Sequence, residues 1–519
     1  LVGGVATYPI SSLTVGNHPI RAIYSGDANF GGSSSGSVGQ AVTQATSTTG
    51  LVSSLNPSTP GTSVTFTATV SGPGSTPTGT VQFKDAAANL GGPVSVNGSG
   101  VATLATSALT VASHPITAVY TGDANYTGST SSVVTQVVNP AVSATVLGSS
   151  LNPSTFGQSV TLTATVTSGI GTPTGTVQFR DGVANVGAPV ALNGSGVATL
   201  VTSTLSAGSH SMSAAYGGDA TRAASTSNTL IQVVNPAATT TALGAHTPDP
   251  SPRGALVAAT WTVGVVGPGA GTPGGTVTVS DGVDSCAAAV AAGGCSVALT
   301  TVGARTLTAT YSGDANFGGS ASAGTAHTVA PGASTTTITS DTPDPSVTGQ
   351  SVTVTFTVTG AAGTPTGNVN VSDGGSVSCA ATVAVGQCVL VFPTAGAKTL
   401  TAAYGGDLNY LSGLSTGVSH LVNAAATTTT LLTHTPDPSV AGAAVAVTWS
   451  VVPTAPGAGT PTGNVTVSDG VDSCTADATV GGCTIAALTT VGTRTLVATY
   501  AGSPNFAGSA SPGVSHTVN

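Results

Sequence analysis

The sequence contains no glutamate and few basic residues. Its 17 acidic residues are all Asp, and its eight basic residues are two Lys and six Arg among 519 residues. Charged residues make up 5% of the chain, against roughly 25% in an average soluble domain. Because Glu, Lys and Arg build the exposed faces of helices, this scarcity argues against helices of any length. Thr, Ser, Val, Gly and Ala dominate instead and favour strands and turns, so we predict an all-β chain.

Other absences limit the partners and the location of the protein. No cluster of Lys and Arg is present to neutralise phosphates, so we expect no nucleic-acid partner. The mean hydropathy is +0.35, yet no apolar run approaches the ~20 residues of a membrane helix, and we predict no transmembrane segment. The opening residues LVGGVATYPISS lack the basic region and apolar core of a signal peptide. We therefore expect either that a signal peptide was removed or that the sequence is an internal piece of a longer chain.

One short motif, YTGDANY and its variants, divides the chain. It occurs six times at intervals of 93 to 96 residues, beginning at Tyr24, Tyr120, Tyr216, Tyr311, Tyr404 and Tyr500. This period is the size of a domain. We predict a partial domain that holds later strands only, followed by five complete domains, and we number these domains 1 to 6: residues 1–44, 45–139, 140–235, 236–330, 331–423 and 424–519.

The copies of the motif differ in a way that indicates its role. The third copy has Thr221 and Arg222 in place of the asparagine and the aromatic residue, and the sixth has Ser503 in place of the aspartate. A metal-binding or catalytic loop would lose its function with these changes, whereas a turn accepts them. We interpret the motif as a structural corner whose first tyrosine closes the core.

Each repeat contains about seven short segments in which apolar residues alternate, for example Val64, Phe66, Ala68 and Val70. Alternation with turn signals every 8 to 12 residues is typical of a β-sandwich of immunoglobulin (Ig) type. The GTPTG turns, the YSGDANF corners and the NPST segments resemble bacterial Ig-like repeats of the group 3 type, which occur in tandem in secreted and cell-surface proteins. The resemblance covers essentially the whole chain and implies spacer or display domains without catalytic residues. Short linkers around Pro140 and Pro236 predict restricted angles between domains and an extended rod on the order of 200 Å.

The partial domain 1 is a separate expectation. Its apolar face, formed by Ile20, Ala22 and Tyr24, would lack a covering layer if the segment were alone. We expect it to be completed by an upstream part of the chain, with strands from a neighbouring subunit as the alternative.

The six cysteines form three pairs, and each pair spans nine positions within domains 4 to 6. This spacing differs from that of zinc knuckles, and no second ligand pair lies nearby. We predict three disulfides, each closing a loop between adjacent strands, in an oxidising, extracytoplasmic compartment. The predicted partners are Cys286 with Cys295, Cys379 with Cys388, and Cys474 with Cys483.

No other residues form a clear catalytic or cofactor site. The motif SDGVDSC occurs twice, and its aspartates, Asp281 with Asp284 and Asp469 with Asp472, could bind calcium, although an Asp-Gly hairpin turn explains them better. His18, His114 and His210 precede the tyrosine strand, and His327, His420 and His516 lie in the last strand of their domains. Residues about 95 positions apart in a row of domains cannot converge on one active site. We assign no catalytic residue, metal or cofactor.

The outward positions of the strands are mostly Thr, Ser, Ala and Val, as in SVTVTFTVTG at residues 351–360. Such faces lack the charges that normally keep sheets apart. We hypothesise a non-enzymatic structural protein, secreted to the extracellular space or the cell surface, that associates laterally or end to end into a fibre or sheath, or with other surface proteins. A monomeric stalk is the simpler interpretation. Two alternatives are an adhesin segment that binds a ligand through its loops and an accessory region of a larger secreted enzyme. A sugar-binding role is poorly supported, because both tryptophans, Trp261 and Trp449, fall on the inward face of a strand.

Overall fold

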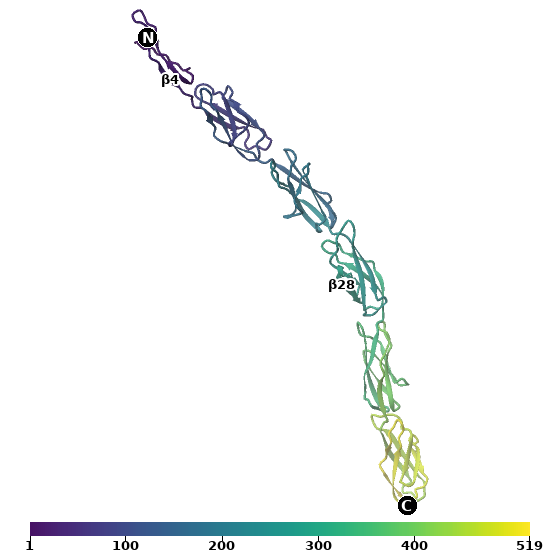
Figure 1. Cartoon of the computed structure of the whole chain (residues 1–519). Helices are drawn as coiled ribbons and strands as arrows, with labels where there is room; N and C mark the ends of the chain where they lie inside the picture. Colours follow the sequence, from purple (N-terminus) through teal and green to yellow (C-terminus); the bar gives the residue numbers. More distant parts are fainter. The chain divides into compact units, whose positions relative to one another are not determined.

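The structure is a computed structural model that describes residues 1–519. The chain divides into two units, Leu1–Ala237 with Gly267–Gly271, and Ala238–Val266 with Thr272–Asn519. Apart from one short 3-10 helix, η1 (Val290–Ala292), all regular structure consists of β-strands, which confirms the prediction of an all-β chain. No helix with the length and apolarity needed to cross a membrane is present. Figure 1 shows the successive domains, coloured along the sequence.

Domain 1 contains two separate pairs of strands. Strand β1 pairs with β4, and β2 pairs with β3, both antiparallel. Its apolar side chains remain largely exposed, including Ile20 at 46% and Ile23 at 69%. The four strands are β1 (Gly16–Ile20), β2 (Ile23–Tyr24), β3 (Ser33–Ser34) and β4 (Val38–Val42).

Domains 2 and 3 each consist of two packed sheets. One sheet has three strands, and the other contains the corner tyrosine on its central strand. In domain 2 the sheets are β10-β6-β5 and β12-β11-β7-β8, with β13 on β11 and β9 on β7. The strands of domain 2 are β5 (Thr48–Ser53), β6 (Val64–Ser71), β7 (Thr80–Asp85), β8 (Ala88–Asn89), β9 (Val94–Ser95), β10 (Val101–Thr106), β11 (Ser113–Tyr120), β12 (Ser129–Thr130) and β13 (Val134–Val137).

The same order recurs in domain 3 as β14-β16-β20 and β15-β23-β21-β17-β18, with β19 on β17 and β22 on β21. Its strands are β14 (Ser143–Ser149), β15 (Ser154–Thr155), β16 (Val160–Ser168), β17 (Thr176–Asp181), β18 (Ala184–Asn185), β19 (Val190–Ala191), β20 (Val197–Thr202), β21 (Gly208–Tyr216), β22 (Ser225–Thr226) and β23 (Leu230–Asn235).

Domains 4 to 6 share this architecture, with one longer strand in place of the two short ones that follow the third major strand. Domain 4 contains β24 (Thr239–Thr247), β25 (Ser251–Pro252), β26 (Leu256–Val265), β27 (Thr276–Ser280), β28 (Ser285–Ala289), β29 (Gly294–Ala298), β30 (Gly303–Tyr311), β31 (Ser320–Ala321) and β32 (Thr325–Ala330). Domain 5 contains β33 (Ser334–Thr342), β34 (Ser346–Val347), β35 (Ser351–Gly360), β36 (Asn368–Ser372), β37 (Ser378–Thr382), β38 (Gln387–Val391), β39 (Gly396–Tyr404), β40 (Gly413–Leu414) and β41 (Val418–Asn423). Domain 6 contains β42 (Thr427–Thr435), β43 (Val445–Pro453), β44 (Asn464–Ser468), β45 (Ser473–Asp477), β46 (Gly482–Ile485), β47 (Gly492–Tyr500), β48 (Ser509–Ala510) and β49 (Val514–Val518).

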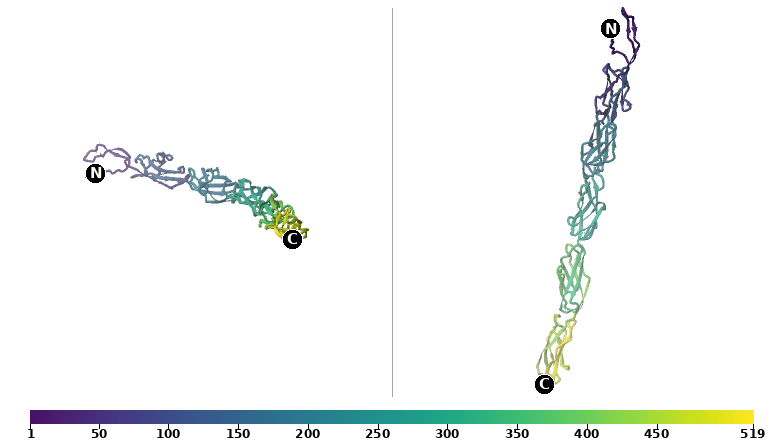
Figure 2. Two further views of the ribbon diagram at one scale, coloured as in Figure 1. Left: turned by 90° about the horizontal axis from the view of Figure 1, so that it is seen from below. Right: turned by 90° about the vertical axis from the view of Figure 1, so that its left-hand side faces the viewer.

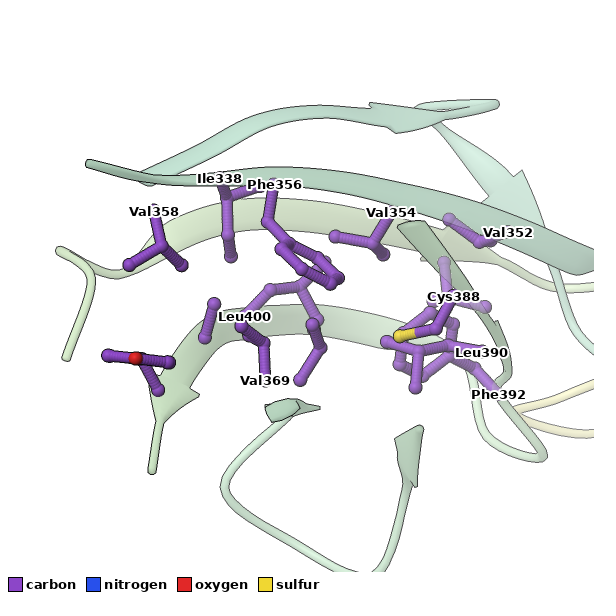
Figure 3. Packing of buried hydrophobic residues seen from close by; sticks show 14 of the residues in the cluster. Ile338, Val352, Val354, Phe356, Val358, Val369, Cys388, Leu390, Phe392 and Leu400 are labelled. Carbon is purple, nitrogen blue, oxygen red and sulfur yellow. The ribbon is translucent and has the colours of Figure 1, made fainter. Parts of the chain in front are cut away.

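The alternation of apolar residues produces one core in each complete domain. In β35 the side chains of Val352, Val354, Phe356 and Val358 are buried, while the residues between them are more exposed. Figure 3 shows these side chains facing Val369 and Leu400 of the opposite sheet. Because successive side chains of a strand point to opposite faces, a period of two is sufficient to build this core. In the right-hand view of Figure 2 the strands of the complete domains run along the length of each domain.

The first strand of each domain crosses between the two sheets. In domain 4, β24 pairs with β26 in the three-stranded sheet, and β25, three residues further along, pairs in parallel with the last strand β32 of the other sheet. The connecting residues Pro248, Asp249 and Pro250 cannot all extend the ladder, because proline has no backbone N–H to donate. We call this connection the crossing.

The chain enters and leaves a domain at opposite ends. In domain 5 the entering residue Gly332 bridges Tyr410, just beyond the corner that follows Tyr404, whereas Val422 near the exit pairs with Gly396 at the far end of the same central strand. Bridges of the same kind place the entry beside the corner in domains 2, 3 and 6. At ~3.3 Å per residue, a nine-residue central strand separates entry from exit by about 26 Å.

Candidate functional site

The aspartate of the corner motif is fully occupied by hydrogen bonds within its own domain. In domain 2, Asp123 Oδ1 accepts the backbone N–H groups of Asn125 and Tyr126 at 2.7 and 2.8 Å, and Oδ2 accepts the backbone N–H and hydroxyl of Thr78 at 2.7 and 2.8 Å. Burial opposes ionisation, but these four donors outweigh it and lower the pKa of Asp123 to about 2. Both oxygens are thus committed to the turn, and neither is free for a metal or a substrate.

The corner tyrosine closes the core beneath this turn. Tyr120 is 1% exposed, and its hydroxyl donates to the carbonyl of Thr78 at 2.7 Å. Burial, followed by the neighbouring Asp123, raises the pKa of Tyr120 to about 12. Gly122 makes the bend at φ +89°, where a Cβ would lie 2.8 Å from the carbonyl oxygen of Tyr126. The corresponding tyrosines Tyr216, Tyr311, Tyr404 and Tyr500 are equally buried, whereas Tyr24 of domain 1 is only half-buried.

The SDGVDSC loops hold their aspartates in the same way. Asp281 accepts the backbone N–H groups of Val283 and Asp284 and an Nε–H···O bond of 2.7 Å from Arg305. Although burial opposes it, these bonds keep the pKa of Asp281 below its ordinary value. Asp284 is bound by the backbone N–H and the hydroxyl of Thr300. Domain 6 repeats the arrangement with Asp469, Asp472, Arg494 and Thr489. Calcium requires six to eight oxygen ligands. Because these carboxylate oxygens already accept hydrogen bonds within the domain, they do not form such a set of ligands.

Two of the histidines that precede the tyrosine corner belong to related ion pairs. His114 lies within β11 rather than before it, and its Nδ1 is 2.7 Å from Asp85 Oδ2. His210 makes the same contact with Asp181 in domain 3. Arg305 takes this position in domain 4. A basic side chain therefore faces the aspartate at the end of the third major strand in domains 2, 3, 4 and 6.

The disulfides connect the two sheets. Cys286 on β28 is bonded to Cys295 on β29, with their Cα atoms 6.0 Å apart. These strands are consecutive in the chain, but β28 pairs with β27 in one sheet and β29 pairs with β26 in the other. Each bridge thus ties neighbouring edges of two sheets, rather than two strands hydrogen-bonded to each other. Domains 5 and 6 contain the equivalent bonds, Cys379–Cys388 and Cys474–Cys483.

A polar cluster lies at the crossing of every complete domain, with its last-strand member buried, its first-strand member partly buried and its middle member exposed. Three positions form this crossing cluster: the end of the first strand, the residue between the two sheets, and the middle of the last strand. In domain 2 they are Ser53, Asn56 and Gln136. Gln136 accepts the hydroxyl of Ser53 at 2.6 Å and donates to Ser58, and Asn56 binds the backbone on both sides of Gln136. Domain 3 repeats this set with Ser149, Asn152 and Gln232.

In domains 4 to 6 the same three positions carry histidine and aspartate. The clusters are His246, Asp249 and His327; Asp341, Asp344 and His420; and His434, Asp437 and His516. Sequence reasoning missed His246 and His434 entirely and treated the other histidines one at a time. Two signals in the sequence could have identified the clusters. The first is the HTPDPS or DTPDPS segment, which is repeated in domains 4 to 6. The second is one extra residue in the strand before this segment: Leu51 precedes Ser53 by two positions, whereas the equivalent Leu243 precedes His246 by three. The extra residue is accommodated as a β-bulge between Leu243 and His246.

A hollow in the molecular surface lies on domain 1. It is an open groove of about 1000 Å³ lined by Tyr8, Ile10, Leu13, Ile20 and Val38, among others. Ile20 corresponds to Ile116 of domain 2, which is completely buried in the core. The groove is thus the interior face of a sandwich and not a shaped ligand site. Trp261 and Trp449, at 4% and 3% exposure, are inside their domains and cannot offer a stacking platform to a sugar.

Two packed sheets, antiparallel except where the first strand crosses to join the last, define a β-sandwich of the Ig type. The chain belongs to the family described as bacterial Ig-like domain (group 3), which matches residues 51–139, 147–235, 245–330, 338–423 and 432–519. The comparison with curated proteins found no match.

Three solved structures illustrate what the chain is similar to. The first is a four-repeat segment from the extending region of a large adhesion protein, 18% identical, covering 73% of this chain and 99% of that one at a TM-score of 0.35. The second is from a 1.5-MDa bacterial ice-binding adhesin, 17% identical over 54% and 98% of the two chains, TM-score 0.24. The third is a Ca²⁺-stabilised adhesin of an Antarctic bacterium, 20% identical over 73% and 100%, TM-score 0.24. At these identities the likeness concerns the fold alone.

Proposed function

We propose that this chain is a non-enzymatic, extracellular structural segment whose tandem Ig-like domains set the distance between the parts of a surface stalk, fibre or sheath. The observation that carries the proposal is the position of the chain ends within a domain. Because the chain enters beside the corner and leaves at the far end of the central strand, each domain adds its own length to the span. A domain whose two chain ends lay on the same side would not add its length to the span.

The chemistry of the domains supports this proposal. The corner and loop aspartates are held by backbone N–H groups, threonines and arginines of their own domain, so their oxygens are already engaged. The family matches account for five domains and comprise only Ig-like repeats. An adhesin segment that binds a ligand through loops, and an accessory region of a larger secreted enzyme, are the competing proposals.

The span is tested with chains that contain two, three, four and five complete domains. Small-angle X-ray scattering should give a maximum dimension that rises by roughly 30–40 Å with each domain, which is the length of such strands with their turns. A maximum dimension that stays constant as domains are added would refute the spacer.

A domain exchange separates the spacer from the adhesin. Domains 2 and 3 have nearly the same length and the same strand order. Replacing domain 3 by a second copy of domain 2 should leave the function of the whole surface protein intact if only the span matters. Loss of cell or surface binding in the exchanged protein, with unchanged span, would favour a ligand site on domain 3.

Self-association, lateral or end to end, belongs to the same proposal. It is supported by outward strand positions such as Thr353, Thr355 and Thr357 of β35, which carry no charge to keep sheets apart. Sedimentation velocity over a wide range of concentration should show assemblies larger than one chain. A single monomeric species at the highest soluble concentration would reduce the proposal to a monomeric stalk.

A further inference from the structure

The crossing clusters of domains 4 and 6 bring together the side chains that transition metals prefer. Each contains two imidazoles and one carboxylate, and in each cluster the candidate ligand atoms all lie within 4.8 Å of one another. The histidines come from the first and the last strand, and the aspartate comes from the crossing between them. Imidazole nitrogen together with a carboxylate is a ligand set suited to Zn²⁺ and similar divalent ions.

Two separations in domain 4, one to each oxygen of Asp249, fit the spacing of ligands in a tetrahedral site. His246 Nε2 lies 3.4 Å from Asp249 Oδ2, and His327 Nδ1 lies 3.5 Å from Asp249 Oδ1. Ligands bound at 2.0–2.2 Å around a tetrahedral ion are about 3.3–3.6 Å apart. Both distances are longer than those of ordinary N–H···O hydrogen bonds, and they are suitable for ligands of one ion.

Two buried nitrogen atoms in domain 4 face Asp249 but make no hydrogen bond. His327 is 1% exposed, its Nε2 is 2.8 Å from the hydroxyl of Ser251, and its Nδ1 makes no hydrogen bond. His246 Nε2 is also buried and without a hydrogen bond. A buried polar atom left without a partner costs free energy, so an interior nitrogen in this state needs an explanation. The bond from Ser251 orients the ring as an outer partner orients a metal-binding histidine.

Domain 6 brings the same three side chains close together. His434 Nδ1 and His516 Nδ1 approach to 2.9 Å, with their rings inclined at 73°. In the absence of an ion this distance fits an N–H···N hydrogen bond between the two rings, and an ion bound by both nitrogens would replace that bond. Asp437 faces both rings at 3.5 and 3.6 Å, and Ser439 holds the far nitrogen of His516 at 2.9 Å.

The other copies within the chain show that the fold itself does not require these residues. Domains 2 and 3 have Ser, Asn and Gln at the three positions, and the glutamine amide satisfies the cluster with hydrogen bonds alone. All three positions differ in domains 4 and 6, and each differs toward a metal ligand. Domain 5 is intermediate: Asp341 replaces the first histidine and already accepts His420 Nδ1 at 2.8 Å, which leaves an oxygen-rich set with its one imidazole engaged.

We propose that domains 4 and 6 each bind one divalent transition-metal ion of the Zn²⁺ class, through His246, Asp249 and His327 and through His434, Asp437 and His516. The aspartate side chains are 36% exposed in both clusters, so the ion enters from that side and water completes its coordination. The bound ion connects the first strand, the crossing and the last strand of its domain.

The test uses the whole oxidised chain after treatment with a chelator. Calorimetric titration with Zn²⁺ at neutral pH should show two strong sites per chain. His327→Gln and His516→Gln should each remove one site, and the double variant should remove both, with a loss of affinity of more than about 100-fold, since even outer partners of such ligands contribute 10–100-fold. Glutamine is chosen because Gln136 and Gln232 occupy the equivalent position in domains 2 and 3.

His420→Gln in domain 5 is the matched control and should leave two strong sites. Co²⁺ should give the intense visible bands of a tetrahedral site in the unmodified chain and not in the double variant. If a glutamine variant fails to fold by circular dichroism, it is replaced by His246→Ser or His434→Ser, because Ser53 and Ser149 occupy that position in domains 2 and 3. No strong Zn²⁺ site in the unmodified chain, two sites remaining in the folded double variant, or tighter binding of Ca²⁺ than of Zn²⁺ would overturn the proposal.

Discussion

Reducing the three disulfides should lengthen the chain released when domains 4, 5 and 6 unfold under force. In the oxidised protein each bridge keeps its loop closed after the sandwich has come apart, so the residues between the two cysteines do not contribute to the extension. Domains 2 and 3 contain no cysteine. The same molecule therefore provides both the test domains and the controls.

The size of the effect follows from the geometry of the bridge. Nine residues of extended chain span about 32 Å at ~3.6 Å per residue, whereas the bonded cysteines keep their Cα atoms 6.0, 5.9 and 6.0 Å apart. Each oxidised domain should thus release about 26 Å less than it would after reduction. The complete domains differ in length by at most three residues, or about 11 Å, so the two classes are separable. The chain-entropy model adds a stabilisation of roughly 2–3 kcal/mol for each bridge.

Single-molecule force spectroscopy on the five-domain chain measures both consequences. The oxidised chain should unfold in two long and three short steps, and the reduced chain in five long steps. The three domains should also unfold at lower force once reduced, because the bridge ties the edges of the two sheets. Five equal steps in the oxidised chain, or steps that reductant does not change, would refute the pairing and the argument from it.

Two further predictions concern charged groups. The corner aspartate should make domain 2 less stable in acid: its folded-state pKa lies near 2, below the unfolded value, so its contribution is complete above about pH 4 and is lost as the pH falls toward about 2. Hydrogen exchange of the corner peptides should show this loss in domain 2 but not in domain 6, where Ser503 replaces the carboxylate, and equal losses in both would contradict it. Arg305→Met should destabilise domain 4 by roughly 3 kcal/mol, because the fully buried Asp281 side chain would lose its cation. The control is Lys398→Met in domain 5, where the ammonium contacts only a threonine hydroxyl at 2.8 Å. In the same denaturation assay this variant should lose far less free energy of unfolding. Similar losses in the two variants would mean that the ion pair is not what stabilises this position.

The chain contains two kinds of domain on one scaffold. Domains 2 and 3 close their crossing with neutral side chains and have no disulfide, whereas domains 4 to 6 combine a disulfide, a β-bulge and a histidine-containing crossing. The disulfide joins the sheets at one edge, and the crossing joins them where the first strand changes sheet. Both features increase the number of connections between the two layers.

The fold of each domain could be predicted from the order of residues because its signals are local. Apolar residues at every second position, as in Val352 to Val358, indicate which face of a strand is buried. The spacing between successive tyrosine corners indicates the length of a domain. Six copies of the corner in one chain also showed which of its residues were replaceable.

Contacts between residues distant in sequence were settled only by the tertiary structure. His246 and His327 are 81 positions apart, and nothing in their local sequence shows that the crossing carries the first strand to the side of the last. The same applies to Cys286 and Cys295: their spacing suggested a local loop, but whether two consecutive strands share a sheet depends on which partners they bind elsewhere. Local periodicity determines which face of a strand is buried, whereas the packing of one sheet on the other determines which polar groups meet inside.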